Sequence, residues 1–320
     1  PDTTSKDAVF QWRGIPQPGQ LLPLGLQHVV AAVVGVITPA ILVADTCGLS
    51  SADKTLMIQV SLILTALATL LQLFPIFHRI GSGLPVIMGI SFAYIPTLQA
   101  IGGEFGLPTI LGAEIVGGIV AIVFGVLVKW IRPLFPPLVT GTVIFTIGLS
   151  LYPTAVKYMA GGAGSEWFGS AKSWAVALIT LAVVVFLNHF TKGITKLASI
   201  LIGILAGYVI AYFLGIVDLS GVGSAAWVAL PRPMPFDIQF VPAACVSLGI
   251  VYVVNAVQTI GDLSSTTMGG MDRMPTDKEL SGGIVGQGVM SILGAFFGGL
   301  PAATYSQNVG IVTVNRVINR

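Results

Sequence analysis

The chain has 320 residues, of which 54% are hydrophobic and only 9% are charged, and its formal net charge is +2. A soluble domain usually has about 25% charged residues, so this composition excludes a water-soluble protein of this size. No basic cluster is present that would bind nucleic acid. Long apolar stretches joined by short loops predict an all-α polytopic membrane protein rather than a β-barrel.

Ten apolar windows approach the length of about 20 residues that a helix needs to cross a bilayer. The third and the tenth are short and interrupted, and residues 1–20 form a polar segment. Because the chain starts without Met and stops directly after an apolar stretch, we expect both ends to be incomplete. The windows are Leu21–Ala44, Thr55–Phe77, Leu84–Ala100, Leu107–Val128, Pro137–Tyr158, Ala171–Phe190, Leu197–Ile216, Phe240–Ile260, Leu280–Phe297 and a tenth that begins near Pro301.

The distribution of Lys and Arg over the loops predicts a cytoplasmic N-terminus, because cytoplasmic loops are enriched in basic residues. In this orientation eleven basic residues lie on the inner side and four on the outer side. The inner residues are Lys6, Arg13, Arg79, Lys129, Arg132, Lys192, Lys196, Arg273, Lys278, Arg316 and Arg320, and the outer ones are Lys54, Lys157, Lys172 and Arg232.

The two interrupted windows do not fit regular helices. The third contains Pro85, Gly89 and Pro96, and proline breaks the hydrogen bonding of a helix. We expect Ile90–Tyr94 to be extended. The tenth window is expected to start extended and to become helical after Asn308.

Irregular backbone at membrane depth is tolerated where it is paired or lines a cavity. The two extended segments are therefore predicted to pair as a two-stranded ribbon. The half-helix after each strand then directs its positive N-terminus at the middle of the membrane. This arrangement predicts a site for a polar or anionic small molecule around Tyr305–Asn308.

Two interrupted segments seven windows apart are typical of an inverted repeat. If the first seven windows form one repeat, only three windows of the second are present. We therefore expect about four further spans beyond this chain, and a complete ten-span protein is the alternative.

One polar stripe marks the eighth window. Asn255, Gln258 and Asp262 are spaced so that they share one helix face, which we expect to face the site. The alternatives are a stripe that binds neighbouring helices and, for Asp262, a position at the membrane interface.

Other polar side chains are isolated within apolar windows and are expensive at that depth. His28 has two equally supported roles, a structural hydrogen bond or direct contact with the substrate or a proton. For Glu114 we favour snorkelling to the outer surface over a role in ion coupling. For Gln287 we favour bridging of helices over substrate contact. No metal-ligand cluster, phosphate loop or nucleophile motif is present.

The segment from Gln307 to Arg316, with Asn308 and Gly310 in an Asn-x-Gly pattern, resembles the signature of the nucleobase–ascorbate transporter family. This family includes the uracil and xanthine permeases. Asn315 departs from the Thr that is usual there. Further landmarks, which extend the likeness over the whole chain from Pro23, are Gln27–His28, Ser91–Tyr94 and Gly261–Asp262.

The resemblance implies a fourteen-span fold of two inverted seven-span repeats, with short β-strands in spans 3 and 10. It divides the chain into a core domain, spans 1–4 (21–128) and spans 8–10 (240–320), and a gate domain, spans 5–7 (137–216). It further implies a homodimer in the cell inner membrane and an elevator-like movement of the core domain.

The resemblance also implies residue roles. Phe92 would offer its backbone N–H to a nucleobase, and Tyr305 and Ser306 would line the site. Gln307 would bind the edge of the base, and Asn308 would support the junction of strand and half-helix. A glutamine at position 307 resembles carriers of purines such as xanthine and urate, whereas uracil carriers tend to have glutamate there.

Two departures from the family concern ion coupling. This chain has Gln258 where the family usually has a glutamate, and Gln287 where many members have an aspartate. An amide does not titrate, although it both donates and accepts hydrogen bonds. A proton would therefore need Asp262, His28 or Glu114; the alternatives are sodium coupling or passive equilibration.

The leading hypothesis is thus a secondary active transporter of an oxidised purine, with Gln258 and Gln307 on two sides of the base and no cofactor other than a coupling ion. The alternatives are a uracil transporter and an uncoupled nucleobase facilitator or channel. A facilitator would stop at equal concentrations. A membrane enzyme or sensor would need a reactive cluster or a soluble domain, and the sequence shows neither.

Overall fold

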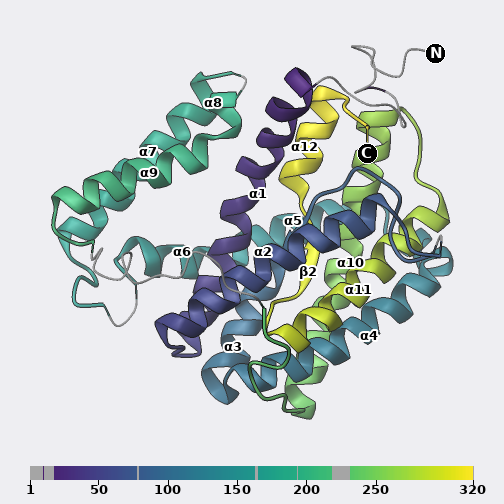
Figure 1. Cartoon of the computed structure of the whole chain (residues 1–320), viewed down its shortest axis with the longest axis horizontal. Helices are drawn as coiled ribbons and strands as arrows, with labels where there is room; N and C mark the ends of the chain where they lie inside the picture. The colour runs from purple at the N-terminus through teal and green to yellow at the C-terminus, as the bar shows by residue number, and fades with distance from the viewer. Residues whose placement is uncertain are drawn as a thin grey trace.

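The structure is a computed structural model that describes residues 10, 18–77, 79–162, 165–192, 194–217 and 231–319. This part of the chain is mostly helical (Figure 1), and six of its helices are long and apolar enough to cross a membrane. The first half contains α1 (Pro18–Thr46), α2 (Ser51–Leu73), β1 (Met88–Ile90), the 3-10 helix η2 (Phe92–Tyr94), α3 (Ile95–Phe105), α4 (Leu107–Ile131), the 3-10 helix η3 (Arg132–Leu134), α5 (Pro137–Ser150) and α6 (Tyr152–Met159).

The second half begins with two helices that pack against each other, α7 and α9. These helices stand apart from the main helical body in Figure 1 and are joined through the short helix α8. The elements of this second half are α7 (Ala171–Phe190), α8 (Ile194–Leu197), α9 (Ser199–Phe213), α10 (Pro242–Met271), α11 (Asp277–Phe297), β2 (Ala302–Thr304) and α12 (Ser306–Asn315).

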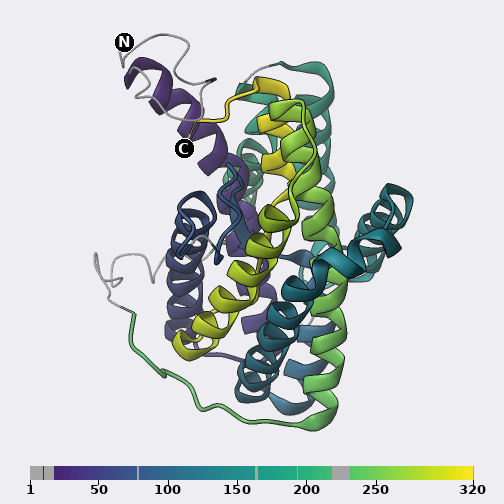
Figure 2. The same cartoon turned by 90° about the vertical axis from the view of Figure 1, so that its right-hand side faces the viewer.

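Glycines allow α4 and α11 to approach closely. A Cβ atom on Gly118 would lie 2.8 Å from the carbonyl oxygen of Gly288, and one on Gly288 would lie 2.6 Å from the carbonyl oxygen of Gly118. In lipid, burial of apolar surface contributes little to the association of helices, so close van der Waals contact between backbones is a main driving force. Helix α10 also packs against α4, and Figure 2 shows α4, α10 and α11 running through the body together.

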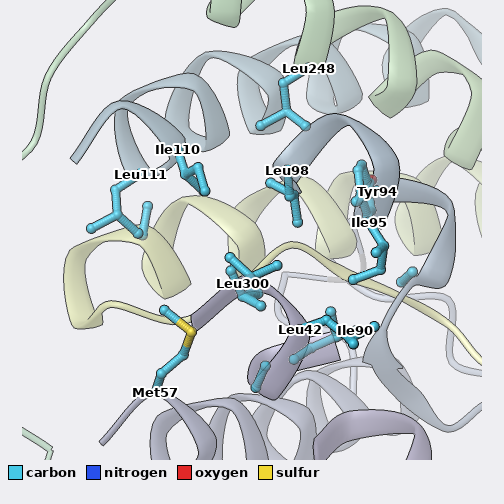
Figure 3. Packing of buried hydrophobic residues seen from close by; sticks show 14 of the residues in the cluster. Leu42, Met57, Ile90, Tyr94, Ile95, Leu98, Ile110, Leu111, Leu248 and Leu300 are labelled. Atoms are coloured by element: carbon cyan, nitrogen blue, oxygen red, sulfur yellow. The ribbon is translucent and has the colours of Figure 1, made fainter. Parts of the chain in front are cut away.

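The apolar core extends from this helix group to α1, α2 and α3. Figure 3 shows Leu42, Met57, Leu98, Leu248 and Leu300 meeting in one cluster, and all five are buried. The same cluster includes residues of both interrupted windows, so the irregular segments are enclosed by apolar side chains rather than exposed to lipid.

The interrupted windows pair with each other as predicted. Strands β1 and β2 are antiparallel, and the Cα partners are Met88 and Thr304, Gly89 and Ala303, and Ile90 and Ala302. All residues of both strands are buried. Each strand satisfies backbone groups of the other in a place without water, which is the condition for irregular backbone at this depth.

The extended and helical parts differ from the sequence prediction in detail. The third window leaves the extended form after Ile90, because the Ser91 hydroxyl accepts a hydrogen bond from the Ala93 N–H at 3.1 Å and starts a 3-10 turn. The expectation that Ile90–Tyr94 is extended is therefore wrong. The tenth window becomes helical at Ser306 and not after Asn308, since the Tyr305 carbonyl already accepts hydrogen bonds from the next turn.

Two predicted windows also have different bounds. The window Pro137–Tyr158 is two helices that meet at Leu151, because Pro153 has no N–H for the hydrogen bond that would continue α5. Helix α10 runs to Met271, beyond the predicted end at Ile260. Hydroxyls in its polar end are satisfied within the helix, since that of Thr266 donates to the Asp262 carbonyl one turn back at 2.8 Å.

Candidate substrate site

A small cavity of about 150 Å³ lies where β1 passes into η2 and β2 passes into α12. Helices α10 and α5 complete its wall. Five of the residues predicted for the substrate site line it: Phe92, Gln258, Tyr305, Ser306 and Gln307. Its other lining residues are Ser91, Ala93, Ile147 and Thr304.

Two helical N-termini face this cavity. The first is η2, which continues directly into α3, and the second is α12. The first N–H groups of a helix have no partner within it, and they carry the positive end of the helix dipole. Phe92 and Ser306 begin these helices and line the cavity, so their backbone N–H groups are the candidate donors to a carbonyl oxygen or an anion.

Asp262 of α10 holds the junction between β2 and α12. Its carboxylate accepts hydrogen bonds from the Thr304 hydroxyl at 2.6 Å and from the Ser306 hydroxyl at 2.7 Å. Asp262 is only 3% exposed. Helix α10 continues for more than two turns beyond Asp262, so its carboxylate is enclosed by protein rather than at the end of the helix.

Gln258 lies one turn before Asp262 and presents its amide to the cavity. Its Nε2 is 3.5 Å from the Ser306 hydroxyl, and its Oε1 accepts a hydrogen bond from Asn255 Nδ2 at 3.4 Å. The polar stripe of α10 therefore faces the two interrupted segments. An amide with one side supported in this way can both donate to and accept from a planar ligand.

A buried network of polar side chains supports this stripe from behind. Asn255 donates to the Ser91 hydroxyl at 3.1 Å and accepts a hydrogen bond from Gln287. Gln287 also accepts from the Thr259 hydroxyl at 2.7 Å and donates to the Tyr94 hydroxyl at 3.4 Å. Gln287 therefore links α11 to α10 and η2 and does not line the cavity.

Asn308 and His28 are placed together and away from the cavity. The Asn308 amide nitrogen lies 3.0 Å from His28 Nδ1 and donates to the His28 carbonyl at 3.1 Å. This contact ties α12 to α1. Gln307 is exposed and its amide lies close to α1, since a Cβ on Gly35 would be 3.1 Å from Gln307 Nε2.

Glu114 is fully buried within α4, so the expectation that it snorkels to the outer surface is wrong. Neither carboxyl oxygen has a hydrogen-bond partner among the described residues. The side chain points into the packing of α4 against α11, where a Cβ on Gly294 would lie 3.4 Å from Glu114 Oε1.

Sequence reasoning missed two parts of the site. Thr304 precedes Ser306 by two residues, and the alternation of a strand would have indicated that both side chains point the same way. Ile147 comes from α5 and carries no chemical signal, so only the tertiary arrangement reveals it. Within the described ranges no group of three or more His, Cys, Asp or Glu side chains could hold a metal ion.

The Tyr305 ring lies flat against Gly89 of β1, and its hydroxyl donates to the Ile90 carbonyl at 3.1 Å. A Cβ on Gly89 would lie 2.2 Å from Tyr305 Cζ. We expect Gly89→Ala to displace the ring, to destabilise the protein by about 1–3 kcal/mol and to lower ligand affinity. Thermal unfolding and ligand binding measure the two effects.

Gly310→Ala is the matched control, because no atom lies within 4 Å of a Cβ at this position in α12. Alanine favours a helix over glycine by about 1 kcal/mol, so this variant should bind as the wild type does. Equal behaviour of the two variants would show that the contact between Gly89 and Tyr305 does not shape the cavity.

Helices long and apolar enough to cross a membrane, paired half-strands and a cavity between them are the organisation of a membrane permease. The chain belongs to the permease family that contains the xanthine, uracil and uric acid permeases, the nucleobase–ascorbate transporter family, because the family model matches residues 19–320.

Individual relatives agree with this membership. The chain is 37% identical to the xanthine permease of Bacillus subtilis over 93% of its own length and 68% of that protein. It is 32% identical to the uric acid transporter UacT of Escherichia coli over 95% of its own length and 63% of that protein. The chain thus spans about two thirds of the length of these relatives.

One solved structure has the same fold. The transmembrane domain of the cyanobacterial bicarbonate transporter BicA matches 94% of this chain with a TM-score of 0.61, at 16% sequence identity and over 78% of its own length. This likeness concerns the fold alone.

Proposed function

We propose that this protein is a secondary active transporter that moves an oxidised purine, such as xanthine or urate, across the cell inner membrane. The observation that carries the proposal is the cavity between the two half-helix N-termini, with the Gln258 amide on its wall. Oxidised purines present alternating carbonyl and N–H groups around a flat ring. Backbone donors on one side and an amide on the other are complementary to that edge.

The proposed contacts follow from the lining residues. Phe92 and Ser306 offer backbone N–H groups to the carbonyls of the base, and Gln258 pairs with an N–H and a carbonyl of the same edge. Gln307 lies at the rim and closes the opposite side. The names of the relatives, xanthine permease and uric acid transporter, support a purine over uracil.

We propose that the family architecture applies to the whole protein, with fourteen spans, a homodimer and a cytoplasmic N-terminus. Residues 21–128 and 240–320 then form the core domain that carries the base, and 137–216 form the gate domain. The presence of Ile147 in the cavity wall supports this division, because α5 contributes one apolar side chain to a site otherwise built by the core segments. An elevator-like movement of the core past α5 would expose the cavity to each side in turn.

A facilitator without ion coupling is the second candidate, and the amides at positions 258 and 287 favour it. Proteoliposomes that contain the protein distinguish the two functions. A coupled transporter accumulates labelled xanthine when a pH or a sodium gradient is imposed, whereas a facilitator stops at equal concentrations. Competition by urate, uracil and bicarbonate defines the substrate class, and inhibition by uracil but not by xanthine or urate would overturn the purine assignment.

Gln307→Glu tests the rim of the site. A carboxylate accepts hydrogen bonds but does not donate them, so we expect xanthine uptake to fall or the preference to shift towards uracil. Loss of one hydrogen bond that the bound base would cover costs about 1–3 kcal/mol, which corresponds to roughly a tenfold to hundredfold weaker apparent affinity. Unaltered uptake of xanthine would count against this placement of the base.

A further inference from the structure

Helix α4 contains a buried carboxyl group, that of Glu114, which does not line the substrate cavity. Glu114 is 0% exposed, and neither of its carboxyl oxygens has a hydrogen-bond partner among the described residues. Buried polar groups in folded proteins nearly always have a partner. A carboxyl group left in this way in a membrane helix points to a function, because its burial is otherwise costly.

A second unpartnered group faces the same place from α10. The Tyr252 hydroxyl is buried beside the Ser291 hydroxyl, although the two do not meet the geometric criteria of a hydrogen bond. Its ring packs against Gly117, one turn after Glu114, where a Cβ would lie 2.2 Å from the ring. Glu114 and Tyr252 therefore meet at the junction of α4 with α10 and α11.

No cation faces Glu114 within the described part of the chain. The ionisable groups that interact with it electrostatically are Tyr94 of η2 and Tyr252 of α10, and tyrosine is neutral near pH 7. Helix α11 contributes only uncharged polar side chains there, those of Gln287 and Ser291. The acidic residue of α3, Glu104, is exposed.

An ionised carboxylate cannot remain in such a place without a partner, whereas the neutral acid can. Proton binding converts –COO⁻ and H⁺ to –COOH, which removes the charge and creates one O–H donor. The Tyr252 hydroxyl, which interacts electrostatically with Glu114, is the acceptor that we assign to that donor.

A line of polar contacts leads from this pocket to the substrate cavity. The Tyr252 and Tyr94 rings pack with their centroids 4.8 Å apart. The Tyr94 hydroxyl accepts from Gln287, which donates to Asn255, and Asn255 supports the Gln258 amide at 3.4 Å. These contacts connect the surroundings of Glu114 to the side chains that hold Gln258 in place.

We propose that Glu114 is a proton-binding site of the transporter, separate from the substrate cavity and linked to it through Tyr94, Gln287 and Asn255. In this role it replaces the titratable groups that positions 258 and 287 lack. The inference rests on the proposed function, since it assigns the proton that would be carried with the purine. Under this proposal recognition and coupling lie at different places: the cavity recognises the base, and Glu114 couples its transport to a proton.

The test uses Glu114→Gln and the matched control Glu104→Gln in proteoliposomes, with labelled xanthine added outside. At one proton per xanthine, a gradient of one pH unit sustains about a tenfold accumulation. We expect the wild type and Glu104→Gln to reach a ratio of this size. We expect Glu114→Gln to stop near a ratio of one, with xanthine binding and exchange without a gradient within about threefold of the wild type, and with uptake that no longer depends on pH.

Each outcome is decisive. Accumulation by Glu114→Gln equal to that of the wild type would overturn the inference and leave the proposed function intact. If Glu114→Gln lost xanthine binding, exchange and accumulation all together, the inference would also be overturned, because Glu114 would then be needed for packing. If the wild type accumulated xanthine under a sodium gradient and Glu114→Gln did not, Glu114 would bind sodium and the proton assignment would be overturned. Absence of xanthine exchange in the wild type would instead refute the proposed function.

Discussion

Asp262→Ala is expected to abolish measurable purine binding while the protein still folds. The substitution leaves the Thr304 and Ser306 hydroxyls, which now donate to the carboxylate at 2.6 Å and 2.7 Å, without their acceptor. Hydrogen bonds to a charged group contribute about 1.5–3 kcal/mol each. Loss of both frees the junction of β2 and α12, so we expect the dissociation constant for xanthine to rise at least about 100-fold.

Asp237→Ala is the control for this experiment. Asp237 is exposed in the segment before α10, and substitutions at such positions usually change stability by less than about 0.5 kcal/mol. Binding of labelled xanthine in detergent measures both variants. Wild-type affinity for xanthine in Asp262→Ala would show that the carboxylate does not hold the junction of β2 and α12 in the form that binds the base.

Gln287→Leu is expected to have the largest effect on stability. Gln287 is 0% exposed and connects Thr259, Asn255 and Tyr94. Leucine has nearly the same volume but makes no hydrogen bonds, so Asn255 Oδ1 and the Tyr94 hydroxyl lose their bonds to Gln287, while the Thr259 hydroxyl keeps its bond to the Asn255 carbonyl at 3.0 Å. Since each buried unsatisfied group costs about 1–3 kcal/mol, we expect the free energy of unfolding to fall by roughly 3 kcal/mol or more.

Gln99→Leu controls for the loss of an amide. Gln99 is only partly buried, and it bonds the Thr46 and Thr154 hydroxyls at 3.2 Å and 3.3 Å, where water can replace it. We expect a loss of less than about 1 kcal/mol there. Thermal unfolding of both variants in the same detergent decides the comparison, and equal loss would contradict a special role of the buried network.

The sequence predicted the ribbon of the two interrupted windows because proline and glycine interrupt the regular helix that a membrane span otherwise forms. It also predicted that Asn255, Gln258 and Asp262 share a face, since that depends only on helical spacing. The interruption of each window and the shared helix face follow from local geometry. The pairing of the two segments followed from the rule that irregular backbone at membrane depth must be paired or line a cavity.

Other features depended on contacts between distant segments. Whether Glu114 points to the surface or inward is decided by Gly294 and Tyr252, which are far away in the sequence. Asp262 lies in the interior because α10 is long and β2 crosses it, and no local pattern contains that fact. The pairing of Asn308 with His28 brings together two residues from opposite ends of the chain.

A structure of the protein with bound xanthine tests the central claim most directly. We predict that the base lies between the Phe92 and Ser306 backbone N–H groups, with the Gln258 amide within hydrogen-bond distance of its edge. A base bound elsewhere, with this cavity filled by side chains or water alone, would contradict the account.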